Sequence, residues 1–207
     1  MTEELFQQGR LLPVIEEFYT LQGEGFHTGK PAYFIRIGGC DIGCSWCDSK
    51  HSWIFGVHLL TPADDLVRRC GSHPSKAVVV TGGEPSFYPL GYLTGKLKEA
   101  GMETFIETSG AYPLTGDWDW ICLSPKRHSP PRPEYFSKAG ELKVIIENED
   151  DFLWAEENAG LAGPQCHLYL QPEWSKRGTM TDRVIEYVKN HPRWRISLQT
   201  HKYIGIP

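Results

Sequence analysis

The sequence predicts an α/β protein with a mostly parallel sheet and fewer helices than strands. Short runs rich in β-branched and aromatic residues alternate with helical patterns, and this order is typical of strand-helix-strand units. Residues with unusual chemistry follow the strands rather than the helices. With 207 residues and no evident linker, we expect one domain over 1–207.

Seven segments have the composition of strands. They are apolar or alternate between apolar and polar residues, and turn-forming residues separate them. The expected strands are YFIRI (33–37), AVVVT (77–81), ETFIE (103–107), WICLS (120–124), LKVII (142–146), HLYLQ (167–171) and RISLQ (195–199).

Helical patterns lie between several of these strands. The expected helices are 62–70, 89–100, 149–159 and 180–190. The first has the clearest end signals, with Thr61 as N-cap, Pro62 at the first helical position, Asp64 completing a capping box and Gly71 after the last turn.

Two segments interrupt the alternation. Residues 110–119 and 125–140 are too rich in proline and glycine to form a good helix. The layer of helices over the sheet is therefore expected to be incomplete.

Composition excludes several classes of protein. The 21 basic and 26 acidic residues give a net charge of −5, and no basic cluster favours direct binding of nucleic acid. No apolar run reaches the roughly 18 residues of a membrane span, and the N-terminus lacks the apolar core of a secretory signal. We expect a cytoplasmic protein with reduced cysteines, of which Cys70, Cys122 and Cys166 are scattered and buried.

The unusual residues follow six different strands at their carboxyl ends. In parallel α/β folds the loops after the strands build the active site, so we expect these loops to converge. The loops contain GGC (38–40), TGGEP (81–85), ETSG (107–110), SPK (124–126), QPEW (171–174) and QTHK (199–202).

Three cysteines with the spacing C-x3-C-x2-C occupy the first of these loops. Cys40, Cys44 and Cys47 can bind three corners of an iron-sulfur cube and leave the fourth iron open to a small molecule. A structural zinc site with His51 as fourth ligand is the alternative that spacing leaves open. Three unligated thiols in one glycine-rich loop would be an oxidation liability.

The cysteine spacing, with an aromatic residue before the last cysteine, resembles the signature of the radical S-adenosylmethionine (radical SAM) superfamily. The TGGEP segment resembles the GGE motif of that superfamily, about 35 residues further along. The resemblance implies a 4Fe-4S cluster whose open iron binds S-adenosylmethionine. One electron from the cluster would then cleave the sulfonium to a 5′-deoxyadenosyl radical.

Further motifs narrow the resemblance. TLQGEG (20–25), CDS (47–49), the C-terminal QTHKYIGIP (199–207) and the chain length are similar to the 7-carboxy-7-deazaguanine synthase family over nearly the whole chain. That family converts 6-carboxy-5,6,7,8-tetrahydropterin to 7-carboxy-7-deazaguanine with loss of ammonia, on the route to 7-deazapurines such as queuosine. The resemblance implies a shortened, incomplete TIM-like barrel, a homodimer, Mg²⁺, and flavodoxin or ferredoxin as electron donor.

The family pattern also implies residues of the S-adenosylmethionine pocket. Hydroxyls and carboxylates suit the ribose and ammonium groups of this ligand, and a glycine at a strand end lets backbone approach it. The corresponding residues are Trp46, Cys47, Asp48, Gly83, Glu107, Ser109, Ser124, Pro125, Lys126, Gln171, Pro172, Glu173 and Trp174.

The same resemblance implies a substrate pocket. Its residues are Leu21, Gln22, Gly23, Arg36, Thr81 and Pro207. Alternation along YFIRI places Arg36 on the face opposite Tyr33, Ile35 and Ile37, where its guanidinium suits the substrate carboxylate or a structural ion pair. Ser49 corresponds to the family's Mg²⁺ contact.

Two other functions explain part of the pattern. A glycyl-radical activating enzyme shares the cysteine motif, but LQGEG and the terminal GIP do not favour it. A zinc-stabilised binding protein would account for the cysteines alone.

Overall fold

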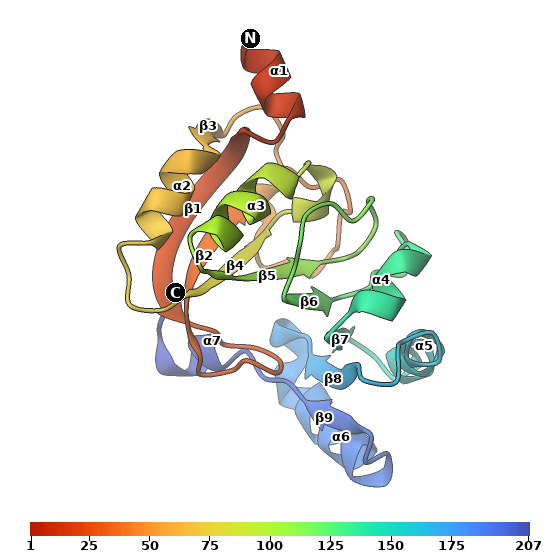
Figure 1. Ribbon diagram of the computed structural model, residues 1–207. Coiled ribbons are helices and arrows are strands. Elements are labelled where there is room, and N and C mark those ends of the chain that lie inside the picture. Colours follow the sequence, from red (N-terminus) through yellow and green to blue (C-terminus); the bar gives the residue numbers. More distant parts are fainter.

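One curved nine-stranded sheet forms the centre of the molecule, in the order β3-β1-β2-β4-β5-β6-β7-β8-β9 (Figure 1). The computed structural model describes the whole chain, Met1–Pro207. From β2 to β9 all neighbouring strands are parallel, whereas β1 is antiparallel to both β2 and β3. The strands are β1 (Leu11–Leu21), β2 (Pro31–Ile37), β3 (Leu59–Pro62), β4 (Ala77–Gly82), β5 (Glu103–Thr108), β6 (Trp120–Leu123), β7 (Glu141–Ile146), β8 (His167–Pro172) and β9 (Trp194–Ile196).

Seven α-helices accompany the nine strands, so the prediction of an α/β fold with fewer helices than strands is confirmed. Figure 1 shows α1 projecting from one end of the sheet and α6 lying at the other end. The helices are α1 (Thr2–Gln7), α2 (Ala63–Cys70), α3 (Gly91–Glu99), α4 (Pro133–Lys138), α5 (Asp150–Ala159), α6 (Arg177–Asn190) and α7 (Thr200–Ile204).

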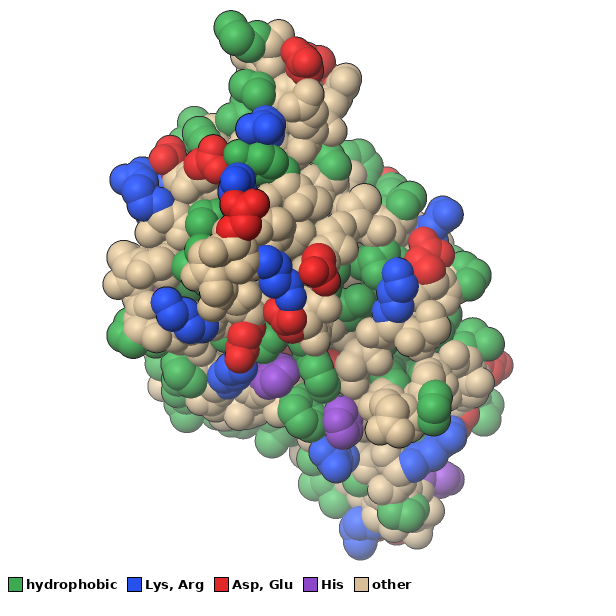
Figure 2. Space-filling model, in the orientation of Figure 1, with side chains coloured by type: hydrophobic (Ala, Val, Ile, Leu, Met, Phe, Trp, Pro, Cys, Tyr) green, Lys and Arg blue, Asp and Glu red, His purple; other side chains and the backbone are tan.

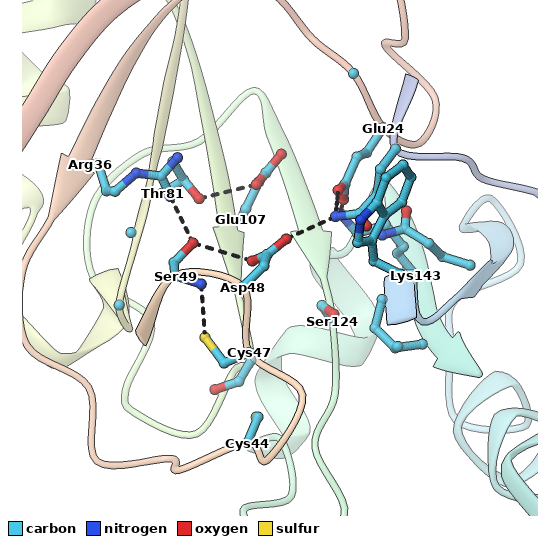
Figure 3. Close-up of a pocket in the computed structure, with 18 of the residues that line it drawn as sticks. Glu24, Arg36, Cys44, Cys47, Asp48, Ser49, Thr81, Glu107, Ser124 and Lys143 are labelled. Carbon is cyan, nitrogen blue, oxygen red and sulfur yellow. Dashed lines mark hydrogen bonds and ion pairs between the residues drawn. The ribbon is translucent and has the colours of Figure 1, made fainter. Parts of the chain in front are cut away.

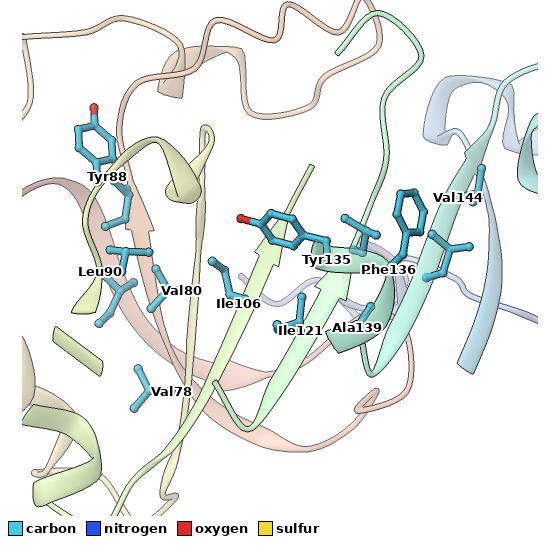
Figure 4. Packing of buried hydrophobic residues seen from close by; sticks show 14 of the residues in the cluster. Val78, Val80, Tyr88, Leu90, Ile106, Ile121, Tyr135, Phe136, Ala139 and Val144 are labelled. Atoms are coloured by element: carbon cyan, nitrogen blue, oxygen red, sulfur yellow. The ribbon is translucent and has the colours of Figure 1, made fainter. Parts of the chain in front are cut away.

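The main hydrophobic core lies between the sheet and α2 to α6. It contains 31 buried residues, and alternate positions of the central strands supply much of it. Figure 4 shows Val80 of β4, Ile106 of β5 and Ile121 of β6 on this face, with Tyr135 and Phe136 of α4 beside them. Because side chains alternate along a strand, the opposite, concave face is left for a smaller apolar cluster and the polar residues described below.

Two antiparallel strands were not expected from the sequence. Pro13 lies within β1, and the register shifts between Val14 and Glu16 where β1 pairs with β2. Both features obscure the strand pattern. The short β3 pairs with Leu11–Val14 and contains Thr61 and Pro62, so the predicted N-cap was wrong: α2 begins at Ala63, with Pro62 as N-cap and no side-chain cap.

The segment 125–140 does contain a helix, contrary to the prediction. Pro133 stands at the start of α4, where a missing N–H costs nothing, and the buried Tyr135 and Phe136 anchor the short helix to the core. The other gap, 110–119, has no helix, as expected. β9 ends at Ile196, earlier than predicted, and the short α1 and α7 carry no strong sequence signal.

The surface and the buried residues bear on three points of the composition. None of the helices is both long enough and apolar enough to cross a membrane. On the face shown in Figure 2, acidic and basic side chains are interspersed. Cys70 and Cys122 are buried as expected, whereas Cys166 is half-buried.

Candidate functional site

A cavity of about 260 Å³ opens at the carboxyl ends of the parallel strands. The loops after β2, β4, β5, β6, β8 and β9 all contribute to its wall, so the structure brings the six loops together. Every site residue expected from the sequence lines this cavity except Pro125, which is buried behind Ser124 and Lys126.

The cysteine loop forms one side of the cavity. Gly39 and Gly43 have φ of +96° and +72°, which only glycine adopts without strain, and they bend the chain around Cys40 and Cys44. Tyr112 donates a hydrogen bond to Asp41, and a His128 ring nitrogen contacts the Ile42 carbonyl. The loop is thus held from outside the cavity while its cysteines line the inside.

Gly83 of the TGGEP segment packs directly against this loop. A Cβ on Gly83 would lie 2.4 Å from the Gly39 carbonyl oxygen and 3.0 Å from the Cys40 Cβ. The Gly83 N–H donates to the Ile37 carbonyl at 2.8 Å, and the Glu84 N–H donates to the Gly39 carbonyl at 3.0 Å. Close approach to the cysteine loop is by itself enough to require glycine here.

The geometry of the cysteines fits a cube better than a single metal ion. No three His, Cys, Asp or Glu side chains lie close enough together to bind one ion, and His51 is exposed outside the cavity. The Cys3His zinc set is therefore not assembled. In a cube each cysteine binds a different iron, so the three thiols need only face one cavity, as they do. Burial raises the pKa of the Cys40 and Cys44 thiols, so iron binding would release protons.

A polar network joins the loop after β9 to the cysteine loop. Lys202 Nζ donates to Asp48 Oδ2 at 2.6 Å, and Gln199 Nε2 donates to the same oxygen at 3.0 Å and to Glu24 Oε1 at 2.9 Å. His201 packs against Gly23 so closely that a Cβ there would lie 2.2 Å from its Nδ1. Three segments far apart in the sequence are therefore joined through Gln199.

A buried ion pair adjoins this network through Glu24, which also accepts from Gln199. Lys143 Nζ of β7 contacts Glu24 Oε2, and the two side chains are 6% and 14% exposed (Figure 3). Burial alone would lower the pKa of Lys143, but Cys122 and the carboxylates of Glu24, Glu107 and Glu141 around it raise that pKa well above its ordinary value. The lysine therefore stays charged and balances several carboxylates.

Glu107 is oriented by two donors, one from the neighbouring strand β4 and one from the segment after β1. Gln22 Nε2 donates to Oε1 at 2.8 Å, and Thr81 Oγ1 donates to Oε2 at 3.1 Å. Figure 3 shows the Thr81 contact and, beside it, Ser49 between Arg36 and Asp48. The cavity thus presents a fixed carboxylate on β5 and a guanidinium on β2, with β4 between them.

Arg36 lies on the concave face, as alternation predicts, with Phe34 of the smaller apolar cluster. Tyr33, Ile35 and Ile37 lie in the main core on the other face. Arg36 Nε donates to Glu16 Oε1 at 2.6 Å, and Nη1 is 3.5 Å from Ser49 Oγ. The residue makes a structural ion pair and lines the cavity at the same time.

Several residues of the cavity were missed by the sequence analysis. Glu24 lies in the LQGEG segment, and Lys143 is a single cation in an otherwise apolar strand, a signal that was available. Glu84 is buried and accepts hydrogen bonds from Ser86, Thr108 and Ser109, so it joins the ends of β4 and β5. For Gln199 and His201, the QTHK motif was the only feature of the sequence that indicated a place in the site.

Comparisons with known proteins agree with these motifs. Residues 34–122 match the family model described as the Radical SAM superfamily. A 7-carboxy-7-deazaguanine synthase of Flavobacterium psychrophilum is 53% identical over 201 residues, covering 97% of this chain and 95% of that protein. The Synechocystis and Escherichia coli K12 proteins of the same name are 46% and 34% identical, over 94% of this chain and 93% and 98% of their own lengths.

A solved structure has the same architecture. The crystal structure of QueE from Escherichia coli superposes with a TM-score of 0.82 at 33% sequence identity. The match covers 96% of this chain and 99% of that chain. The incomplete barrel implied by the motifs is therefore found in a related protein of nearly the same extent.

Proposed function

The chain belongs to the 7-carboxy-7-deazaguanine synthase family of radical SAM enzymes, and we propose from this premise that it converts 6-carboxy-5,6,7,8-tetrahydropterin to 7-carboxy-7-deazaguanine. Ammonia leaves as the ring contracts, and the product enters queuosine and 7-deazapurine biosynthesis. The observation that carries the proposal is the position of the three-cysteine loop, which opens into the same cavity as Gln22, Arg36 and Glu107.

Membership of the superfamily implies a 4Fe-4S cluster and S-adenosylmethionine. Cys40, Cys44 and Cys47 would bind the cluster, since they are the thiols that line the cavity. When bound, the cluster and S-adenosylmethionine supply the radical chemistry that abstracts hydrogen from C6 of the pterin. The protein positions the reactants and excludes water.

The S-adenosylmethionine side of the cavity is proposed from the family pattern and from the cavity lining. Ser109, Ser124 and Gln171 provide hydroxyl and amide groups at the ends of β5, β6 and β8. Trp46 and Trp174 provide apolar surface at the two sides. Lys126 donates to the Ser124 carbonyl and hydroxyl, both at 2.7 Å, and so holds that loop in place.

The substrate side is proposed to lie between β1, β2, β4 and the C-terminus. Glu16 accepts from Arg36 Nε, and Nη1 makes only a long contact of 3.5 Å with Ser49 Oγ, so the terminal nitrogens of the guanidinium can turn to a substrate carboxylate. Gln22 and Thr81 hold Glu107 with both carboxylate oxygens fixed, which suits donors on the pterin ring. Leu21, Gly23 and Pro207 complete this side of the wall.

Mg²⁺ is proposed to bind next to Ser49. One hydroxyl is a weak ligand for this ion, so water and the substrate's oxygens would supply the remaining positions. Ser49 Oγ already contacts Asp48 Oδ1 at 3.2 Å, which places a carboxylate nearby. We therefore expect tight Mg²⁺ binding only with substrate present.

The family resemblance also suggests partners and a location in the cell. A homodimer, flavodoxin or ferredoxin as electron donor, and a cytoplasmic location fit a reduced iron-sulfur enzyme. The free cysteines support a reducing compartment.

An anaerobic assay tests the function. Protein with reconstituted cluster is mixed with S-adenosylmethionine, dithionite, Mg²⁺ and 6-carboxytetrahydropterin, and products are identified by mass spectrometry. We expect 7-carboxy-7-deazaguanine, and its loss in Cys44→Ala. If only 5′-deoxyadenosine forms, the cluster assignment stands and the pterin assignment fails.

A further inference from the structure

Trp53 contacts the cysteine loop at both ends. Its backbone carbonyl accepts a hydrogen bond from the Cys40 N–H at 3.2 Å, and its indole Nε1 donates to Cys47 Sγ at 3.4 Å. The side chain is half-buried and lines the cavity. One residue outside the motif therefore bridges the first and third cysteines.

The three sulfurs differ in their hydrogen-bond donors. Cys47 Sγ accepts from the Ser49 N–H at 3.4 Å in addition to the indole of Trp53. The donors near Cys40 and Cys44 are backbone N–H groups. The indole is thus the side-chain donor to a cysteine sulfur in this loop, and substitution can remove it without changing the backbone.

We propose that Trp53 is a positioning residue that raises the reduction potential of the cluster through its hydrogen bond to Cys47. The inference rests on the proposed function, because it requires a cluster on the three cysteines. A donor to a ligand sulfur withdraws negative charge and so favours the reduced cluster, which carries one more electron. Reduction takes that electron from an external donor, and no bond in the protein forms or breaks.

The turn that presents Trp53 is held independently of the indole. Ser52 Oγ donates to the Ser49 carbonyl at 2.6 Å, and the Ser52 carbonyl accepts from the Gly39 N–H at 2.7 Å. Lys50 Nζ lies 5.8 Å from the centre of the Trp53 ring. Because backbone and serine contacts define the turn, Trp53→Phe should keep the loop and lose only the N–H.

The test compares midpoint potentials of Trp53→Phe and wild type. Each protein is reconstituted anaerobically, its iron is counted, and the potential is measured by a dithionite titration followed by electron paramagnetic resonance. Trp118→Phe is the matched control, because the Trp118 indole donates to the Thr115 carbonyl at 2.8 Å, away from the cavity. We expect a more negative potential in Trp53→Phe and an unchanged one in Trp118→Phe.

A second variant is needed for the case in which Trp53→Phe fails to retain the cluster. Trp53→His keeps a ring with an N–H donor, so if Trp53→Phe loses iron, retention of iron by Trp53→His supports the hydrogen bond. Iron loss in both variants assigns the effect to packing and overturns the proposal. An unchanged potential in Trp53→Phe with four irons also overturns it, whereas absence of a four-iron cluster in wild type would reject the proposed function itself.

Discussion

Lys202 in the C-terminal helix α7 donates to Asp48, the residue that directly follows Cys47, at 2.6 Å. Gln199 from the same segment bridges Asp48 and Glu24. Tyr203 packs edge-on against Trp174 with ring centroids 5.3 Å apart. The end of the chain is therefore attached to the cysteine loop, to the LQGEG loop and to the loop after β8.

Lys202→Met should loosen this attachment and lower kcat/KM by about tenfold, as substitutions in an outer shell commonly do. Iron content should stay at the wild-type value, because Lys202 contacts no cysteine. Turnover and protease sensitivity near residues 199–207 would report the change. Lys189→Met is the matched control, since Lys189 pairs only with the exposed Glu186. Equal turnover in both variants would contradict the attachment.

The same ion pair predicts a pH dependence. Burial would raise the pKa of Asp48, but the hydrogen bond and charge of Lys202 outweigh burial and lower it to about 2. A carboxyl with a lowered pKa stabilises the fold above its ordinary pKa near 4 and loses this contribution as the pH falls through about 2. Asp48 is half-exposed, so the effect should stay below about 1 kcal/mol.

Urea unfolding of wild type and Lys202→Met between about pH 5 and pH 2 would measure this contribution. The difference in free energy of unfolding should shrink as the pH falls, because Asp48 becomes protonated as the pH approaches its lowered pKa of about 2. Glu156 also has a lowered pKa, so only the difference between the two proteins is informative. A difference that stays constant over this range would argue against the ion pair.

The sequence predicted the parallel strands and the site loops better than the sheet's antiparallel edge. Buried parallel strands such as AVVVT have a continuous apolar pattern, and the motifs after them mark the cavity. β1 was missed because Pro13 and the adjacent Glu16 and Glu17 break the apolar pattern that identifies a strand. The strand forms through its pairing with β2 and β3. Local patterns contain no such information.

Contacts within the site were less predictable than membership of it. Glu24, Lys143 and Gln199 come from segments more than 50 residues apart, and only the fold brings their side chains together. Gly83 was expected near a ligand and does line the cavity, but its close approach to Gly39 is a packing contact that the motif does not indicate. A motif identifies which loops meet, but tertiary packing decides which atoms touch.

Lys143→Met should destabilise the protein by about 3–5 kcal/mol, because it leaves buried carboxylates without their cation. Glu24 is the direct partner, and Glu107 and Glu141 lie around the same ammonium group. Urea denaturation of Lys143→Met and of the double variant Lys143→Met/Glu24→Gln measures how far the two side chains depend on each other for stability. We expect the double variant to recover part of the loss. No recovery would mean that Lys143 acts through packing rather than charge.

A C-terminal extension should inactivate the enzyme without unfolding it. Gly205 has a φ of +69°, and this left-handed turn after α7 directs the chain to Pro207 at the cavity wall. The Ile206 N–H donates to the His201 carbonyl at 3.1 Å and fixes the turn. Because Pro207 is itself exposed, added residues need not disturb the core.

Six histidines after Pro207 should therefore lower kcat/KM by about tenfold or more through misplacement of the substrate. The same tag before Met1 is the control, since Met1 is 96% exposed and α1 projects from the far end of the sheet (Figure 1). Iron content and the thermal unfolding midpoint should agree between the two tagged proteins, so that a difference in turnover reports the cavity alone. Equal turnover with either tag would place Pro207 outside the substrate contacts.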